Sequence, residues 1–287
     1  MKDFEYVKVK TLGEAVALLA KNGEKAHILA GGTDVLVKLK QRQMSPEILI
    51  DIKGIPGLEG IEYRPGGGMR IGSLTLIREI EISPVVKEHL PVLAHAAHVL
   101  GSVQVRHRAT IGGNLCNALP SADMGPYLIG MGASVLVTGP EGERKLPVED
   151  LFADSGKNSL VIGEIVTAIE IPPWSPHTGG SYMKHAIKNA VDVAIVSVAG
   201  VVVTDPLKKV FEEARIVLGA VGPRPIRAKQ AEEFLRSKRI GEEVIVRAGE
   251  LASEEARPRT TIEYKTEMVK VLTRRVVKEA LERIPRG

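Results

Sequence analysis

The chain has 287 residues, which is enough for about two domains and a large hydrophobic core. Hydrophobic residues make up 44% and charged residues 26%, a balance that excludes an intrinsically disordered chain. The single cysteine, Cys116, excludes an internal disulfide and a cysteine-held zinc or iron–sulfur site built by this chain alone. Because the net charge is only +4, with scattered basic residues and 3% aromatic residues, no nucleic-acid partner is predicted.

The hydropathy pattern predicts no membrane span. The longest apolar run, residues 193–203, is interrupted by Ser197 and Gly200. It is about half of the roughly 20 residues that a membrane helix needs, so it is interpreted as a buried strand. The first five residues lack the apolar core of a signal peptide, and we therefore expect a cytoplasmic protein.

The first fifty residues are predicted to form a small α/β unit. Thr11 followed by Glu14 is a capping-box pattern, which predicts a helix over residues 11–22. Two compact apolar runs, residues 26–30 and 47–52, are typical of buried strands. Glycine and proline follow the second run and mark the end of the unit.

The next part of the chain favours a strand hairpin followed by helices and further strands. The turn of the hairpin is the segment Pro65-Gly66-Gly67-Gly68. The expected strands cover residues 61–63, 69–71, 135–137, 145–146 and 165–171, and the expected helices cover residues 74–80 and 91–100.

A proline- and glycine-rich segment, residues 172–180, is predicted to be a domain junction, because its three prolines and two glycines interrupt regular structure. Strands and then helices follow it, which predicts an α+β layer with a three-stranded antiparallel sheet covered on one face. The expected strands are residues 182–187, 193–203 and 210–221, and the expected helices are residues 228–238, 242–255 and 261–283.

Two glycine-containing loops, residues 30–34 and 110–114, are candidate phosphate-binding segments. Glycine has no Cβ, so backbone amides can approach a pyrophosphate closely, while Thr and Asn side chains add neutral hydrogen bonds. Neither loop has the G-x-G-x-x-G spacing of a Rossmann site or the lysine of a Walker motif. Each loop alone is also compatible with a plain turn. The two loops together indicate a dinucleotide site that is of neither the Rossmann nor the Walker type.

Asp123 follows the second loop at the start of an apolar segment, residues 124–133. Two interpretations are open for its side chain. It caps a helix, or it contacts the ribose or the ring of a bound nucleotide.

The whole chain resembles the FAD-binding medium subunit of molybdenum hydroxylases, of the xanthine dehydrogenase and carbon monoxide dehydrogenase type. The resemblance is carried by Ala30-Gly-Gly-Thr-Asp34, by Val105-Arg-His-Arg-Ala-Thr-Ile-Gly-Gly-Asn114 and by Asn117-Ala-Leu-Pro-Ser-Ala-Asp123. These segments match the two flavin signatures of the family.

The resemblance implies an α+β fold with an FAD-binding, PCMH-type (vanillyl-alcohol-oxidase-like) N-terminal part of two subdomains, residues 1–54 and 55–174. A C-terminal domain of the medium-subunit type, residues 175–287, would follow. FAD would lie between the two subdomains, with its pyrophosphate in the two glycine loops and its ring toward the third domain. Carried over by position, the cofactor-binding residues are Ala30, Gly31, Gly32, Thr33, Asp34, Val35, Thr110, Gly112, Gly113, Asn114, Cys116, Asn117, Asp123 and Val166.

The resemblance also places Tyr182 and Lys184 close to the isoalloxazine ring. A cation there would stabilise anionic reduced flavin and tune its potential. The alternative for Lys184 is a solvated lysine at a strand edge. The chain departs from the family pattern at His107, at Leu119 and in residues 188–192, so the surface that faces the electron acceptor is where we expect differences.

The other candidate sites are weaker. His95 and His98 share a helical face, but no carboxylate or thiol lies at a compatible spacing, and no metal site is predicted. Cys116 has no neighbouring His or Asp relay, so it is interpreted as a small buried residue and not as a nucleophile. No catalytic residue is assigned.

The function implied by the resemblance is electron transfer. FAD would accept electrons from a [2Fe–2S] small subunit and pass them to an external acceptor, while a molybdenum-cofactor large subunit oxidises the substrate. The alternative is a self-contained FAD-dependent oxidoreductase with its own small substrate. That enzyme would need an acid or base near Tyr182 and Lys184, where only His185 is available. A third class, a flavin-free scaffold, is disfavoured by the intact glycine loops.

Overall fold

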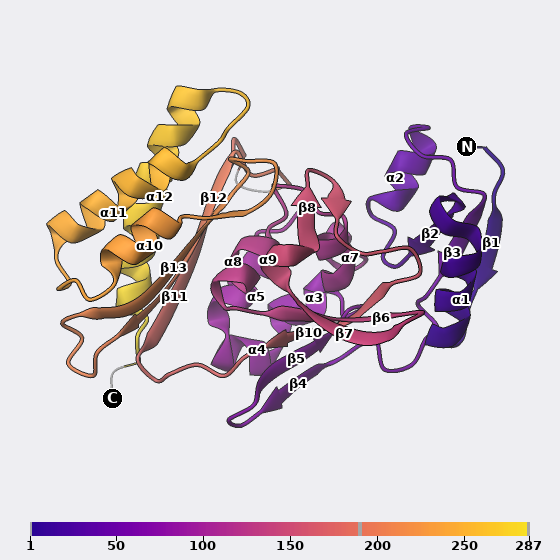
Figure 1. Cartoon of the computed structure of the whole chain (residues 1–287), viewed down its shortest axis with the longest axis horizontal. Helices are drawn as coiled ribbons and strands as arrows, with labels where there is room; N and C mark the ends of the chain where they lie inside the picture. Colours follow the sequence, from indigo (N-terminus) through magenta and orange to yellow (C-terminus); the bar gives the residue numbers. More distant parts are fainter. Residues whose placement is uncertain (1, 189–190, 286–287) are drawn as a thin grey trace.

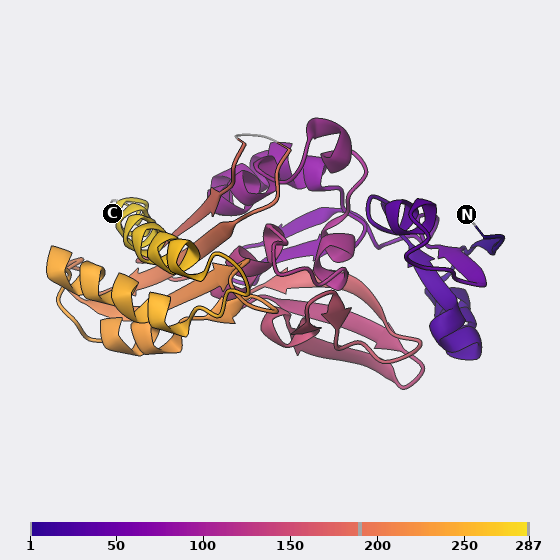
Figure 2. The same ribbon diagram turned by 90° about the horizontal axis from the view of Figure 1, so that it is seen from above.

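Three units follow one another along the long axis of the molecule (Figure 1). The computed structural model describes residues 2–188 and 191–285. Figure 2 shows the same row from above, with the N-terminal unit at one end and the C-terminal helices at the other. Among the described residues, no helix is both long enough and apolar enough to cross a membrane.

The first unit is a three-stranded parallel sheet in the order β1-β3-β2. Its predicted capping box is confirmed, because the Glu14 amide donates to Thr11 Oγ1 at 3.2 Å and the Glu14 carboxylate accepts from the Thr11 amide. The elements are β1 (Glu5–Lys8), α1 (Leu12–Asn22), β2 (Ala26–Leu29), α2 (Val35–Lys40) and β3 (Ile48–Asp51).

The middle unit is built on a five-stranded antiparallel sheet in the order β4-β5-β10-β6-β7. The predicted hairpin is confirmed as β4 paired with β5. The strands are β4 (Ile61–Arg64), β5 (Gly68–Gly72), β6 (Ser134–Gly139), β7 (Gly142–Pro147) and β10 (Ile165–Ile171), with a small hairpin of β8 (Phe152–Asp154) and β9 (Lys157–Asn158). The helices are α3 (Ile77–Ile82), α4 (Pro84–His89), α5 (Pro91–His98), α6 (Val103–Arg106), α7 (Ile111–Cys116), α8 (Met124–Gly130) and α9 (Val148–Leu151).

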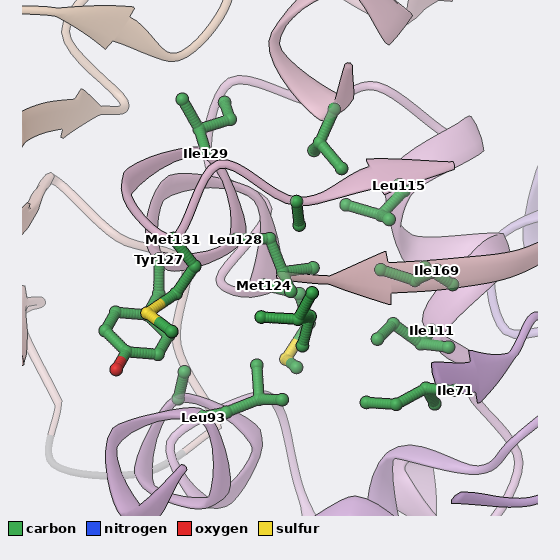
Figure 3. Close-up of a cluster of buried hydrophobic side chains, with 14 of the residues drawn as sticks. Ile71, Leu93, Ile111, Leu115, Met124, Tyr127, Leu128, Ile129, Met131 and Ile169 are labelled. Atoms are coloured by element: carbon green, nitrogen blue, oxygen red, sulfur yellow. The ribbon is translucent and has the colours of Figure 1, made fainter. Parts of the chain in front are cut away.

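The core of the middle unit fixes α7 against the sheet. Buried side chains of α7, such as Ile111 and Leu115, pack with Ile71 of β5 and Ile169 of β10 (Figure 3). Burying each of these side chains stabilises the fold by roughly 2 kcal/mol. The helix that contains the second glycine loop is therefore held by the core.

The third unit contains the predicted antiparallel strands, with a fourth strand of two residues added at one edge. Its strands are β11 (Thr178–His185), β12 (Val196–Thr204), β13 (Phe211–Gly219) and β14 (Ile226–Arg227). Its helices are α10 (Lys229–Leu235), α11 (Glu242–Glu255) and α12 (Ile262–Glu282).

The expectation that helices cover this sheet on one face only is wrong, because helices cover both faces. Helices α10 and α12 cover one face, and α5 and α8 of the middle unit cover the other (Figure 1). Side chains of β12 alternate between the two layers: Val198 and Val202 pack with the C-terminal helices, whereas Ala199 and Val201 join the core of the middle unit. The continuous apolar run of β12 reflects burial on both faces.

The predicted junction at residues 172–180 is also too long, because β11 begins at Thr178 and includes Gly179 and Gly180. A Cβ on Gly179 would lie 1.9 Å from the carbonyl oxygen of Ala280 in α12. Glycine is therefore needed in this strand to let α12 pack against it, and not to end it.

A buried ion cluster in the middle unit holds the segment that leads to the second glycine loop. The Arg106 guanidinium donates to the Glu81 carboxylate at 2.7 Å and to the Leu100 carbonyl at 3.0 Å. Arg78 and His98 also contact Glu81, at 3.0 and 2.9 Å. Burial opposes ionisation of Glu81, but the hydrogen bonds from His98, Arg78 and Arg106 outweigh it and lower the pKa of Glu81 to about 2.

Replacing Gly179→Ala should destabilise the protein by about 2 kcal/mol, because the added methyl group overlaps the Ala280 carbonyl and displaces α12. The control is Gly13→Ala in α1, where a Cβ meets no atom within 4 Å and alanine is the better helix former. Denaturant unfolding of both variants measures the difference. Equal midpoints would contradict the assigned role of Gly179.

Replacing Glu81→Gln should cost on the order of 3 kcal/mol at pH 7, because the Arg106 guanidinium is left buried without its counter-charge. The pKa of Glu81 is lower in the folded protein, about 2, than its usual value of 4.5. The advantage of the wild type is therefore complete above about pH 4.5 and is lost as the pH falls toward 2. Denaturant unfolding of both proteins between pH 7 and pH 3 should show the gap narrowing, whereas a constant gap would refute this account.

Candidate functional site

The first glycine loop, residues 30–35, connects β2 to α2 and offers free hydrogen-bond donors. The backbone N–H groups of Gly31, Gly32, Thr33 and Asp34 donate to no acceptor within the described part of the chain. Gly32 has a φ of +80°, a conformation that glycine adopts readily. Consecutive free amides in a loop form a concavity suited to an anion, so this loop fits a pyrophosphate.

The second glycine loop, predicted at residues 110–114, is not a loop in the structure: Thr110 is the N-cap of α7, and the loop glycines lie in this helix. Its amides, unlike those of the first loop, already have partners. The Gly113 amide donates to the Thr110 side chain at 3.1 Å, and the Gly112 amide donates to the Ser73 carbonyl at 2.8 Å. Within the described residues, Asn114 Oδ1 is buried without a hydrogen-bond partner. A buried unsatisfied amide oxygen is costly, so the Asn114 side chain is the group that this loop offers to a ligand.

Glycines of both loops lie against the backbone of neighbouring segments. A Cβ on Gly31 would lie 1.9 Å from the Arg108 carbonyl oxygen, just before the second loop. A Cβ on Gly112 would lie 2.8 Å from the Ser73 carbonyl oxygen. Alanine does not fit at either position without a backbone shift, so these glycines permit the close approach of the segments.

A second contact joins the first unit to the end of the second loop. The Lys38 ammonium of α2 donates to Asn117 Oδ1 at 2.8 Å. The Cys116 carbonyl accepts a hydrogen bond from the Asn158 side chain at 2.8 Å. Burial raises the pKa of the Cys116 thiol to about 12, so the thiol stays protonated at neutral pH, in line with its interpretation as a non-nucleophilic residue.

Val166 lies on β10 within the hydrophobic core of the middle unit, next to α7. Its side chain is buried by the protein itself. The structure therefore shows this predicted ring contact as a core residue of the middle unit.

The helix-cap interpretation of Asp123 is wrong. Asp123 precedes α8, but its side chain makes no capping hydrogen bond. One carboxylate oxygen accepts from the Tyr182 hydroxyl at 2.9 Å, and the other accepts from the Lys184 ammonium at 3.0 Å. Residues of the second and third units therefore meet at this carboxylate.

The interpretation of Lys184 as a solvated lysine is also wrong, because its side chain is only 8% exposed. Its ammonium donates to the Val99 carbonyl at 3.1 Å as well as to Asp123. Tyr182 is 1% exposed and belongs to the core that joins the two units. Burial raises the pKa of Tyr182, and the Asp123 charge adds to this effect, so the hydroxyl remains a donor.

Sequence reasoning missed Lys38, Ser73 and Asn158 as supports of the two loops. Lys38 and Asn117 are 79 positions apart, and Asn158 and Cys116 are 42 apart. No local spacing connects such pairs. The only sequence signal was the pair of glycine loops, which requires that something pack against them.

Comparisons with known proteins agree with this architecture. Residues 2–174 match the family described as FAD binding domain in molybdopterin dehydrogenase, and residues 181–280 match the CO dehydrogenase flavoprotein C-terminal domain.

Among individual proteins, the chain is 34% identical to the carbon monoxide dehydrogenase medium chain of Hydrogenophaga pseudoflava, over 98% of both chains. It is 31% identical to the xanthine dehydrogenase FAD-binding subunit of Escherichia coli O157:H7, over 98% of this chain and 97% of that subunit. Its fold matches a chain of the solved carbon monoxide dehydrogenase of H. pseudoflava with a TM-score of 0.94 over 99% of both chains, at 34% identity. The chain therefore belongs to the family of FAD-binding medium subunits of the molybdenum hydroxylases.

Proposed function

We propose that this chain is the electron-transfer subunit of a molybdenum hydroxylase complex. It would take electrons from a [2Fe–2S] small subunit and pass them, through FAD bound between the two glycine loops, to an external acceptor. A molybdenum-cofactor large subunit would oxidise the substrate. The observation that carries this proposal is the approach of Gly31 to the Arg108 carbonyl, which brings the first loop close to the segment that leads to the second loop. Within the described residues, the amides of residues 31–34 have no acceptor and Asn114 Oδ1 has no donor.

The residues of the two loops divide the task of holding FAD. The free amides of residues 31–34 would bind the negatively charged pyrophosphate, and Asn114 Oδ1 would accept a hydrogen bond from the cofactor. Lys38 is bonded to Asn117 and would fix the relative position of the loops. When bound, FAD supplies a carrier that accepts electrons singly or in pairs.

Two observations support a role inside a complex. The chain has one cysteine, Cys116, so it cannot hold an iron–sulfur cluster by itself. Relatives carry the names of subunits, such as the carbon monoxide dehydrogenase medium chain and the 6-hydroxypseudooxynicotine dehydrogenase complex subunit alpha.

The alternative, a self-contained oxidoreductase, would need a base near the ring. Its candidate, His185, is hydrogen-bonded to the Tyr264 hydroxyl at 2.7 Å.

An absorbance or fluorescence titration should show that the wild-type chain binds FAD more tightly than FMN, because FMN lacks the pyrophosphate that the loops hold. Gly31→Ala should weaken FAD binding at least tenfold, or about 1.4 kcal/mol, because its Cβ forces the first loop away from Arg108. Gly13→Ala serves as the matched control, since its Cβ meets no atom within 4 Å. Unchanged FAD affinity in Gly31→Ala would place the site elsewhere.

The role of partner subunits can be tested by expressing the tagged chain with and without its genomic neighbours. The co-purified complex should contain iron and acid-labile sulfide and should reduce its flavin with substrate. The isolated FAD-loaded chain should be reduced by dithionite but not by candidate aldehydes or aromatic heterocycles. Rapid reduction of the isolated chain by such a substrate would favour the self-contained oxidoreductase instead.

A further inference from the structure

The Asp123 cluster, formed by Asp123, Tyr182, Lys184 and the Val99 carbonyl, connects three elements. Asp123 stands at the start of α8, Tyr182 and Lys184 lie two residues apart on β11, and Val99 follows α5. Three hydrogen bonds of 2.9 to 3.1 Å link them. Both Asp123 oxygens accept from donors, which is the pattern expected for an ionised carboxylate.

This cluster changes what Lys184 can do for a nearby flavin. The Lys184 ammonium lies 3.0 Å from the Asp123 carboxylate, so the pair is neutral as a whole. An uncompensated cation would favour the reduced, more negative flavin strongly, whereas a neutral ion pair favours it much less. With the FAD ring bound beside Lys184, as the family resemblance implies, the carboxylate of Asp123 would determine how much positive charge lies near the ring.

Tyr182 contacts this ion pair from the hydrophobic core. Its side chain is 1% exposed and packed in the core shared by the middle and third units. The aromatic ring of Tyr182 is enclosed by this core, while its hydroxyl donates to Asp123 Oδ1. The hydroxyl both stabilises the ionised carboxylate and fixes its position beside Lys184.

We propose that Asp123 sets the reduction potential of the bound flavin by compensating the charge of Lys184, and that Tyr182 is a positioning residue that holds Asp123 in place. This inference rests on the proposed FAD site between the glycine loops and on the ring position near Tyr182 and Lys184 that the family resemblance implies. It differs from a direct role of Tyr182 in cofactor contact, because Tyr182 exerts its effect through the carboxylate.

The test compares Asp123→Asn, Tyr182→Phe and the control Tyr127→Phe with wild type. Tyr127 is a second buried tyrosine in the same core, and it makes no hydrogen bond to Asp123 among the described residues. FAD affinity is measured first by titration, and the midpoint potential of the bound FAD is then measured by equilibration with reference dyes.

Asp123→Asn should raise the preference for reduced over oxidised FAD about tenfold, which for a two-electron couple is a positive shift of about 30 mV. Tyr182→Phe should shift the potential in the same direction by a smaller amount, and Tyr127→Phe should leave it unchanged. If Asp123→Asn does not fold or bind FAD, Lys184→Met is used at pH 8.5. It leaves the carboxylate unpaired and should shift the potential in the negative direction.

The outcomes separate this inference from the function on which it rests. Absence of FAD binding in wild type, also when it is co-expressed with its partner subunits, would refute both. Normal FAD binding with an unchanged potential in Asp123→Asn, or in Lys184→Met where that variant replaces it, would overturn the charge-setting role alone. A shift in Asp123→Asn without any difference between Tyr182→Phe and Tyr127→Phe would overturn the positioning role of Tyr182.

Discussion

The approach of the Gly31 backbone to the Arg108 carbonyl is the contact on which the arrangement of the site depends. A single methyl group at position 31 would meet that oxygen at 1.9 Å, so the first and middle units can meet this closely only through glycine. The middle unit keeps its side of the contact rigid, because Arg106, two residues before Arg108, is hydrogen-bonded to the Glu81 carboxylate. The segment that leads to the second loop is consequently held in place on the middle-unit side of this contact.

The two loops offer different hydrogen-bonding groups. Within the part of the chain that the structure describes, the first loop leaves its amides free. The second satisfies its amides through Thr110 and Ser73 and leaves Asn114 Oδ1 without a partner. This division has a physical reason. The second loop begins a helix packed on the core, where unpaired amides would be costly, while the first loop lies at the end of a short parallel sheet.

Local sequence patterns predicted the elements whose causes are local. Thr11 and Glu14 lie three residues apart and cap α1 as expected, and the glycine turn gives the β4–β5 hairpin. Contacts between distant residues could not be predicted in this way. Asp123 and Tyr182 are 59 positions apart, so the local pattern suggested a helix cap for Asp123. Gly179 packs against a helix about a hundred residues later, so the local pattern suggested a chain break there.

The Asp123–Lys184 pair joins the third unit to the middle unit through buried charges. A buried lysine without a counter-charge would be expensive, and the carboxylate that compensates it comes from the segment that follows the second glycine loop. The geometry of the pair depends on how β11 sits against α5 and α8. Because Tyr182, Val201 and Val217 belong to the same core as those helices, apolar packing between the two units fixes the position of this charge pair.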